Sequence, residues 1–268
     1  MDVPLSVYLL TCNNADTVEV ALKSVAFADE IVVVDSGSTD NTLEIVKRYA
    51  TKVLHRDWTG FRDQYQFAAD QCSHDWALFI DADEEIGPML KDEIHRTLEA
   101  NSMQPPDEQI RGFHGHRRTF YLDRWILHGG WLPDHEIRLY HRSYGEWKGG
   151  LHANIHIDGP VAELKGFYYH YTYRNISDQL QTVDKYSTTA AQDMDEAGKR
   201  FSMGKLLISP LARFLKEYLL KRGFLDGLPG LIIAVNTACH VFNKHAKLYE
   251  RQCLNRDRVA KAKASKPE

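Results

Sequence analysis

The segment IVVVDSGSTDNTLEIVKRY, from Ile31 to Tyr49, reads as a strand, a turn and a helix in direct succession. Its first four residues form an unbroken β-branched run, which is typical of a strand covered on both faces. Asp35–Asp40 predicts a turn, and Ser38 or Asp40 is expected to be the N-cap of the helix that Leu43–Tyr49 continues. The segment therefore predicts the strand–helix repeat of an α/β protein.

The same alternation extends on both sides of this segment. Short apolar runs predict strands, and apolar residues at helical spacing predict helices. The expected strands are Leu5–Leu10, Lys52–His55 and Trp76–Ile80, and the expected helices are Thr17–Val25 and Phe61–Cys72. We therefore predict an α/β fold with a mostly parallel sheet and helices on both faces.

The composition is typical of a globular protein in a reducing compartment. The chain has 268 residues, 43% of them hydrophobic, which is enough to bury a core. Its formal charge of −4 argues against a nucleic-acid partner. The four cysteines lie far apart without a C-x-x-C pair, which favours the cytoplasm. We expect no signal peptide, and no run reaches the roughly 20 apolar residues of a membrane span.

Polar clusters follow three of the predicted strands. They are Thr11–Asn13, Asp35–Ser36 and Asp81–Asp83. Open parallel sheets bind ligands beyond the carboxyl ends of their strands. The three clusters therefore predict a ligand site at one edge of the sheet; the alternative is that these loops are simply polar.

In the stretch WALFIDADEE, Trp76–Glu85, an apolar run leads into four carboxylates within five residues. Neighbouring carboxylates raise one another's pKa, so a nearby positive charge is expected. Mg²⁺ and Mn²⁺ prefer oxygen ligands and bridge carboxylates to phosphates. We therefore predict a divalent cation at Asp81 and Asp83. The alternative is a helix N-terminus, where Pro88 suits the first turn and acidic residues such as Glu84 and Glu85 favour the dipole.

Several motifs in order resemble the nucleotide-sugar domain of family-2 glycosyltransferases, which have the GT-A fold. They are LSVYLLTCNNADTVEVALKSV, ADEIVVVDSGSTDNTLEIVKRYA and DWALFIDADEEI, followed by HGGWLPDHEIRLYHR and HYTYRNISDQL. The resemblance covers roughly residues 4 to 250 and is strongest to bacterial lipopolysaccharide-core glucosyltransferase-like proteins. It implies an enzyme that moves a sugar from a nucleotide-diphosphate donor, with a UDP-sugar favoured, to a glycan or lipid-linked acceptor.

The resemblance also implies roles for individual residues. The nucleoside pocket would be lined by Thr11, Asn13, Asp35 and Ser36. Asp81 and Asp83 would hold the metal and the donor diphosphate, and His170 is a candidate third metal ligand. The chain departs from the family pattern at Tyr65, where relatives have a basic residue that Arg62 is expected to replace, and at Ala153, where relatives often have glutamate.

Asp134, in Trp131-Leu-Pro-Asp134, is the candidate catalytic base by the same resemblance. Inverting transfer needs a carboxylate that takes the proton of the acceptor hydroxyl, and positive charge on the departing diphosphate. Trp131 and Arg138 are the candidate contacts to the acceptor or the sugar. The alternatives are core packing for Trp131, and a turn or a salt bridge to Arg138 for Asp134.

We expect a glycosyltransferase domain over residues 1–175, a helical extension over 176–255 and a disordered basic tail over 256–268. Apolar residues from Leu207 to Leu219 form one helical stripe with basic residues beside it, a pattern that suits a helix lying on anionic lipid. This predicts peripheral contact with the inner face of the cytoplasmic membrane. The alternative is packing against the catalytic domain or a second subunit.

Two other classes compete with a glycosyltransferase. A nucleotidyltransferase also places paired aspartates beside an α/β sheet, but it needs a glycine-rich, basic phosphate loop, which LLTCNNADT lacks. A non-catalytic nucleotide-sugar-binding module would not need the complete set of Asp81, Asp83 and Asp134. The sequence therefore favours the transferase.

Overall fold

The computed structural model describes residues 3–132, 135–150 and 153–253, which form two compact units. The α/β unit comprises the described residues up to 120 and those between 135 and 172. The helical unit comprises residues 121–132 and 173–253. The segment 121–132 thus packs with the C-terminal helices, although it precedes much of the α/β unit in sequence. The predicted domain boundaries at residues 175 and 255 stay predictions.

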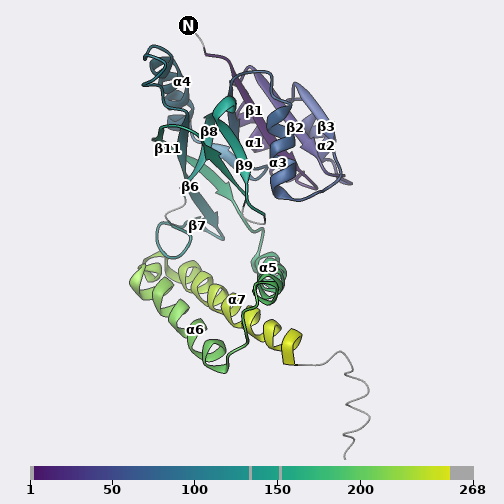
Figure 1. Ribbon diagram of the computed structural model, residues 1–268, viewed down its shortest axis with the longest axis vertical. Helices are drawn as coiled ribbons and strands as arrows, with labels where there is room; N and C mark the ends of the chain where they lie inside the picture. The colour runs from purple at the N-terminus through teal and green to yellow at the C-terminus, as the bar shows by residue number, and fades with distance from the viewer. Residues whose placement is uncertain (1–2, 133–134, 151–152, 254–268) are drawn as a thin grey trace, which may run out of the picture. The chain divides into compact units, whose positions relative to one another are not determined.

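Four parallel strands form one half of the main sheet (Figure 1). Their spatial order is β3 (Lys52–His55), β2 (Glu30–Asp35), β1 (Leu5–Thr11) and β4 (Trp76–Phe79). The register places Thr11 beside Asp35 and Tyr8 beside Phe79. The loops that follow β1, β2 and β4 therefore lie at the same edge of the sheet.

The other half of the sheet is mixed. After β4 come β8 (His135–His141), β6 (Gly112–Tyr121), β11 (Val161–Tyr171) and β5 (Glu84–Ile86). β8 is antiparallel to both β4 and β6, β6 and β11 are parallel, and β5 is antiparallel to β11. The predicted α/β, GT-A-like class is confirmed, with a parallel N-terminal half and a mixed remainder.

Helices cover both faces of the sheet in the α/β unit, as predicted. The first face packs against α1 (Val18–Ser24), α2 (Thr42–Val46) and α4 (Pro88–Ser102). The opposite face packs against α3 (Phe61–Asp70) and against a small hairpin of β9 (Gly145–Lys148) and β10 (Asn154–Ile157). A 3₁₀ turn, Arg142–Tyr144, leads into β9.

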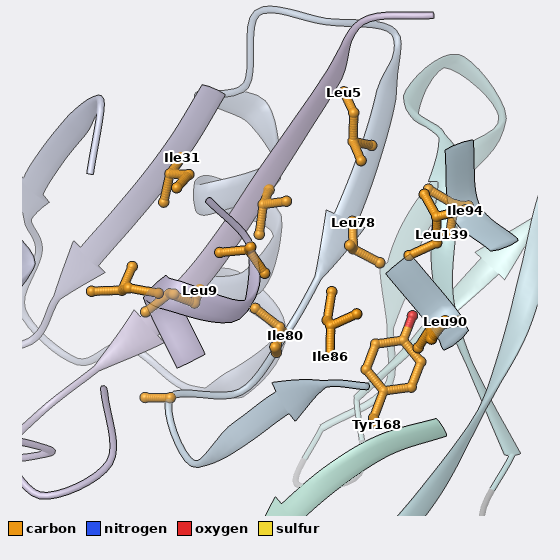
Figure 2. Packing of buried hydrophobic residues seen from close by; sticks show 14 of the residues in the cluster. Leu5, Leu9, Ile31, Leu78, Ile80, Ile86, Leu90, Ile94, Leu139 and Tyr168 are labelled. Carbon is orange, nitrogen blue, oxygen red and sulfur yellow. The ribbon is translucent and has the colours of Figure 1, made fainter. Parts of the chain in front are cut away.

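Residues alternate between these two faces along each central strand. Leu5, Leu9 and Ile31 pack in one cluster with Ile80 and Leu90 (Figure 2). Their neighbours on the strands, including Tyr8 and Val32, pack in the cluster on the other face. Because a strand's side chains point alternately to either side, an unbroken apolar run is what a doubly covered strand requires.

The helix after β2 differs from its prediction. It spans only Thr42–Val46, and its N-cap residue is Asn41 rather than Ser38 or Asp40. Asp40 instead accepts a hydrogen bond from the Thr42 N–H at 3.0 Å. The Ser38 hydroxyl donates a hydrogen bond to the Asp35 carboxylate instead of capping the helix. The capping prediction was wrong because Ser38 belongs to the polar loop at the strand ends.

The helical unit contains three long helices (Figure 1). They are α5 (Ile176–Glu196), α6 (Met203–Leu215) and α7 (Gly227–Cys253). A π-helical turn, Lys216–Leu220, and a 3₁₀ turn, Gly223–Asp226, connect α6 to α7. The short strand β7 (Arg124–Trp125) lies in the segment 121–132. In that segment, Tyr121 and Ile126 are buried against Ile233 of α7.

The apolar stretch Phe224–Phe242 contains Gly227, Pro229 and Gly230, yet α7 begins at Gly227 and continues through the stretch. Gly230 is needed because a Cβ there would lie 2.0 Å from the Gly223 carbonyl oxygen. Within the described residues, one helix, Gly223–Gln252, is long and apolar enough to cross a membrane, and 39% of its most apolar window is buried in the protein.

Candidate active site

The loops after β1 and β2 are held together by hydrogen bonds. Asp35 is 2% exposed and accepts from the backbone N–H groups of Gly37 at 2.9 Å and Ser38 at 3.0 Å. The backbone N–H of Ser36 donates to the Thr11 carbonyl at 3.0 Å. Thr11, Asp35 and Ser36 thus converge at the carboxyl ends of their strands, where the nucleoside pocket was predicted.

Asn13 completes this loop cluster in a left-handed conformation, with φ of 58°. Asparagine tolerates this conformation better than most residues. Its backbone N–H donates to the Ser38 hydroxyl at 2.9 Å, and its side-chain carbonyl accepts from the Thr39 N–H at 2.8 Å. All four predicted nucleoside residues are therefore brought together, and their contact with a nucleoside stays a prediction.

The acidic loop between β4 and β5 forms a tight turn. The Asp81 N–H donates to the Glu84 carboxylate at 3.0 Å, and the Glu84 N–H donates to the Asp81 carbonyl at 3.0 Å. The Glu84 side chain is fully buried, whereas those of Asp81 and Asp83 are 31% and 36% exposed. The turn therefore keeps one carboxylate inside and presents two to solvent.

Arg138, on β8, supplies positive charge to this loop from within the protein. Its guanidinium is 3% exposed and lies 3.3 Å from Asp81, 3.1 Å from Glu84 and 3.1 Å from Glu136. Arg117 adds a second contact to Glu84 at 3.3 Å. The charge that the acidic stretch requires is thus partly provided by two arginines. The guanidinium N–H groups of Arg138 contact these carboxylates. Its predicted contact with acceptor or sugar stays a prediction.

The two half-buried aspartates, Asp81 and Asp83, differ in their proton affinity. Burial, followed by the Glu84 charge, raises the pKa of Asp81 to about 6, although Arg138 opposes the shift. Burial would also raise the pKa of Asp83, but the hydrogen bond and charge of His170 outweigh it and lower that pKa. The pKa of His170 is raised by the same pairing, against the effect of burial.

The donor atoms available here fit a metal ion that is held partly by substrate. Asp83 Oδ2 and His170 Nε2 lie 3.3 Å apart. Asp81 precedes Asp83 by two residues in the same loop. Within the described residues, no three His, Cys, Asp or Glu side chains converge in a closed metal cluster. Mg²⁺ and Mn²⁺ sites on phosphate substrates need only one or two protein carboxylates, because phosphate oxygens and water complete the shell.

The structure describes the residues at which the chain departs from the family pattern, Tyr65 and Ala153. Tyr65, on α3, donates to Asp81 Oδ1 at 3.4 Å, and its ring stacks on Trp147 with centroids 4.3 Å apart. Arg62 is 56% exposed and pairs with Asp63 at 2.7 Å. Tyr65 thus reaches the acidic loop directly, while no contact among the described residues brings Arg62 to it. Ala153 packs in the apolar cluster beside the β9–β10 hairpin.

Glu84 is the site residue that the sequence analysis misread. Glu84 and Glu85 lie in β5, and α4 begins only at Pro88, after the N-cap residue Gly87, with no acidic residue in its first turn. The helix-dipole interpretation of the two glutamates was therefore wrong. The sequence Glu84-Glu85-Ile86 lacks the apolar alternation that signals a strand, because a glutamate holds the first buried position.

Asp134 and His152 lie outside the described residues. Asp134 immediately precedes β8, the strand that carries Arg138 to the acidic loop. Trp131 belongs to the helical unit, where its ring lies edge-on to Tyr121 with centroids 5.3 Å apart. This half-buried packing supports the structural interpretation of Trp131 and leaves its predicted sugar contact untested.

Comparison with known proteins identifies the family. The sequence model of glycosyl transferase family 2 matches residues 6–149. The lipopolysaccharide core biosynthesis glycosyltransferase LpsC of Rhizobium meliloti is 30% identical over 94% of this chain and 94% of its own length. An uncharacterized glycosyltransferase of Rickettsia typhi is 30% identical over 96% of this chain and 90% of its own length. The chain therefore belongs to glycosyl transferase family 2.

Two solved structures align with most of this chain at low identity. TarS of S. aureus, residues 1–349, aligns with a TM-score of 0.46 and 16% identity over 93% of this chain and 91% of that one. Glucosyl-3-phosphoglycerate synthase from Mycobacterium tuberculosis, in complex with Mn²⁺, UDP and glucosyl-3-phosphoglycerate, aligns with a TM-score of 0.43 and 17% identity over 74% of this chain and 81% of that one.

Proposed function

We propose that this protein is an inverting, metal-dependent glycosyltransferase that moves a sugar from a UDP-sugar to a hydroxyl group of a glycan acceptor. The observation that carries the proposal is the acidic loop, which holds two partly exposed carboxylates beside the polar loops after β1 and β2. Asp81 is held by buried Arg138 and Glu84, and Asp83 is held by His170. Folding alone gains little from two accessible carboxylates in such a loop, whereas a donor diphosphate needs a cation there.

Each part of the site has a distinct task in this proposal. Thr11, Asn13, Asp35 and Ser36 bind the nucleoside at the strand ends. Asp81, Asp83 and His170 would hold a divalent cation together with the diphosphate. When bound, that cation supplies positive charge to the departing diphosphate. Tyr65 and Arg138 set the position of the Asp81 carboxylate through their contacts with its two oxygens.

Asp134 is proposed as the base. A single displacement at the sugar carbon needs one carboxylate that accepts the proton of the attacking hydroxyl. Asp134 is one residue before β8, and Arg138, four residues further on, contacts Asp81. β8 therefore connects Asp134 in sequence to Arg138, which contacts the acidic loop. Glu136, which is 43% exposed and pairs with Arg138, is the alternative carboxylate on the same segment.

Lipopolysaccharide core or other cell-surface glycan is the proposed acceptor class. One relative, 30% identical over nearly the whole chain, is named for lipopolysaccharide core biosynthesis. Such acceptors carry lipid, and the helical unit exposes an apolar surface that would suit a membrane. We place the protein in the cytoplasm at the inner face of the cytoplasmic membrane.

This apolar surface extends over α6, the turns after it and the start of α7. α6 has no buried residue, and Lys205, Lys216 and Arg222 beside the surface are exposed. Apolar side chains with basic neighbours favour an anionic lipid surface. The side chains of the apolar surface, each 42% to 80% exposed, are Leu207, Ile208, Leu211, Leu215, Leu219, Leu220, Phe224, Leu225 and Leu228.

The test is hydrolysis of a panel of nucleotide sugars, without acceptor, in the presence of Mn²⁺ or Mg²⁺. A glycosyltransferase releases free sugar and UDP from its preferred donor slowly. A nucleotidyltransferase would instead cleave between the two phosphates, and a binding module would leave every donor intact. Release of UDP that stops on addition of EDTA supports the proposal, and either of the other two results contradicts it.

A further inference from the structure

The helical unit contains a pocket of about 220 Å³ that the catalytic site does not use. It opens between α5 and α7, and Trp131 and Tyr173 line one end. From α5 come Gln179, Thr182, Val183 and Tyr186, which recur at helical spacing on one face. α7 contributes Asn236, Thr237 and His240. We call this the helical pocket.

Three aromatic rings form the apolar part of the helical pocket. Trp131 is fixed by an edge-on contact with Tyr121 at 5.3 Å and by Tyr173, whose ring centroid is 6.1 Å away. Tyr121 is fully buried behind them. Tyr186 remains 42% exposed at the pocket. A rigid aromatic wall of this kind is preorganised for a flat, partly apolar ligand.

The floor of the helical pocket is polar and buried. Gln179 is 3% exposed and Asn236 is 7% exposed. The Gln179 side-chain carbonyl accepts hydrogen bonds from the Tyr121 hydroxyl and from the Asn236 amide. No hydrogen bond within the described part of the chain engages the Gln179 amide nitrogen or the Asn236 side-chain oxygen. Buried amides with spare hydrogen-bonding capacity at a pocket are usually satisfied by a ligand or by water.

The lining is also uncharged, which narrows the chemistry of a ligand. Among the nine lining residues there is no Asp, Glu, Lys or Arg. Burial, and then the neighbouring Lys244, lowers the pKa of His240, so its ring is neutral near pH 7. A phosphate, nucleotide or carboxylate would need a cation or a helix N-terminus. Aromatic faces combined with neutral amides and hydroxyls suit a polyhydroxylated, uncharged ring.

We propose that the helical pocket binds one uncharged sugar residue of the acceptor glycan, with its C–H face against the aromatic wall and its hydroxyls on Gln179 and Asn236. This inference rests on the proposed function, since it needs a glycan acceptor. Two walls of the pocket are close in sequence to the proposed site: Trp131 is three residues before Asp134, and Tyr173 is three residues after His170. The chain therefore connects the helical pocket directly to both segments.

The test is saturation-transfer NMR on the full chain, with methyl glycosides of neutral hexoses and of N-acetylhexosamines as probes. Dissociation constants on the order of 1 mM or weaker are expected for a single ring. Thr237→Trp fills the helical pocket and should abolish the transfer. Val235→Trp adds the same ring to the exposed side of α7 and should leave it unchanged.

Tyr186→Ala gives a second measurement that does not depend on folding of the filled variant, because this ring is already 42% exposed. It should weaken sugar binding about two- to tenfold, as expected for one aromatic contact. Absence of saturation transfer from the wild type to every glycoside, or wild-type affinity in both Thr237→Trp and Tyr186→Ala, overturns the proposal. Affinity for UDP with Mn²⁺ is measured on the same samples. Sugar binding without UDP binding would contradict the proposed function alone, and the reverse would contradict the helical pocket alone.

Discussion

The two candidate sites, one in each unit, handle charge in opposite ways. In the α/β unit, Arg138 and Glu84 are almost fully buried and hold the partly exposed carboxylate of Asp81. In the helical unit, the helical pocket is lined by neutral groups, and α6 leaves its apolar side chains exposed. Buried ion pairs suit a site that must neutralise a diphosphate, whereas neutral and apolar surfaces suit sugars and lipid. We therefore propose that the α/β unit carries the chemistry and that the helical unit binds the acceptor.

The largest effect is expected at the proposed base. Asp134→Asn preserves size but cannot accept a proton, so transfer should fall by roughly 10²–10⁴-fold, mainly in kcat. Binding of UDP with Mn²⁺ should be retained, because the acidic loop is unchanged. Glu136→Gln is the matched control on the same segment and should keep most of the turnover. If Glu136→Gln instead loses turnover and Asp134→Asn keeps it, the base has been assigned to the wrong carboxylate.

The buried charge of the α/β unit predicts a large effect on stability. Arg138→Ala leaves Glu84 buried with only Arg117 beside it, which should lower the free energy of unfolding by about 3–5 kcal/mol. Urea denaturation measures this. Arg96→Ala, at an exposed position on α4, should change it by less than about 0.5 kcal/mol. Similar values for the two variants would mean that Arg138 contributes little to holding the acidic loop.

The exposed apolar surface of the helical unit predicts membrane binding. Burying one leucine is worth about 1.5–3 kcal/mol, so Leu207→Glu combined with Leu211→Glu should weaken binding to anionic lipid vesicles at least about tenfold. Sedimentation with vesicles of phosphatidylglycerol checks this. Val20→Glu, at a 41% exposed position in the α/β unit, should bind vesicles like the wild type. Wild-type protein that stays in the supernatant would rule out lipid as the partner of this surface.

The smallest expected effect separates the two aspartates of the acidic loop in metal-free protein. The pKa of Asp81 in the folded state, about 6, lies above its ordinary value of 3.8. Its stabilising effect is therefore present below the ordinary value and lost as pH rises through about 6. Asp81→Asn should raise the melting temperature by a few degrees at about pH 8, and this gain should shrink as pH falls through about 6 and disappear below about pH 4.

Asp83 provides the control of opposite sign. Its folded-state pKa is lowered by His170, so its stabilising effect is present above the ordinary pKa and lost as pH falls through the folded value. Asp83→Asn should therefore lower the melting temperature near neutral pH. Equal responses of the two variants in differential scanning calorimetry with EDTA would contradict the assigned environments.

The first half of the fold could be predicted because its signals are local. The runs that became β1, β2 and β4 are short, apolar and bounded by polar turns, and each helix between them has its own periodicity. β6, β8 and β11 lie in a region rich in His, Arg and Tyr with no clean period. Their pairing depends on contacts between distant residues, such as Ala77 on β4 with Tyr140 on β8, which no local pattern encodes.

The candidate site shows the same limit. Asp81 and Asp83 could be found because they are adjacent in sequence at a strand end. Arg138, the arginine that contacts Asp81, is 57 residues from it in the chain, and its place in the sequence predicted a contact with acceptor or sugar instead. The length of α2 was overestimated, since Leu43–Tyr49 has helical periodicity but α2 ends at Val46.

The central claim is that the acidic loop binds a donor diphosphate through a divalent cation, and calorimetric titration of UDP tests it most directly. The account predicts that wild-type affinity falls at least about tenfold when Mn²⁺ is removed with EDTA, as for loss of a metal contact. Asp83→Asn in Mn²⁺ should bind UDP as weakly as the wild type in EDTA. Equal UDP affinity with and without Mn²⁺, or an Asp83→Asn variant that binds like the wild type in Mn²⁺, would contradict the claim.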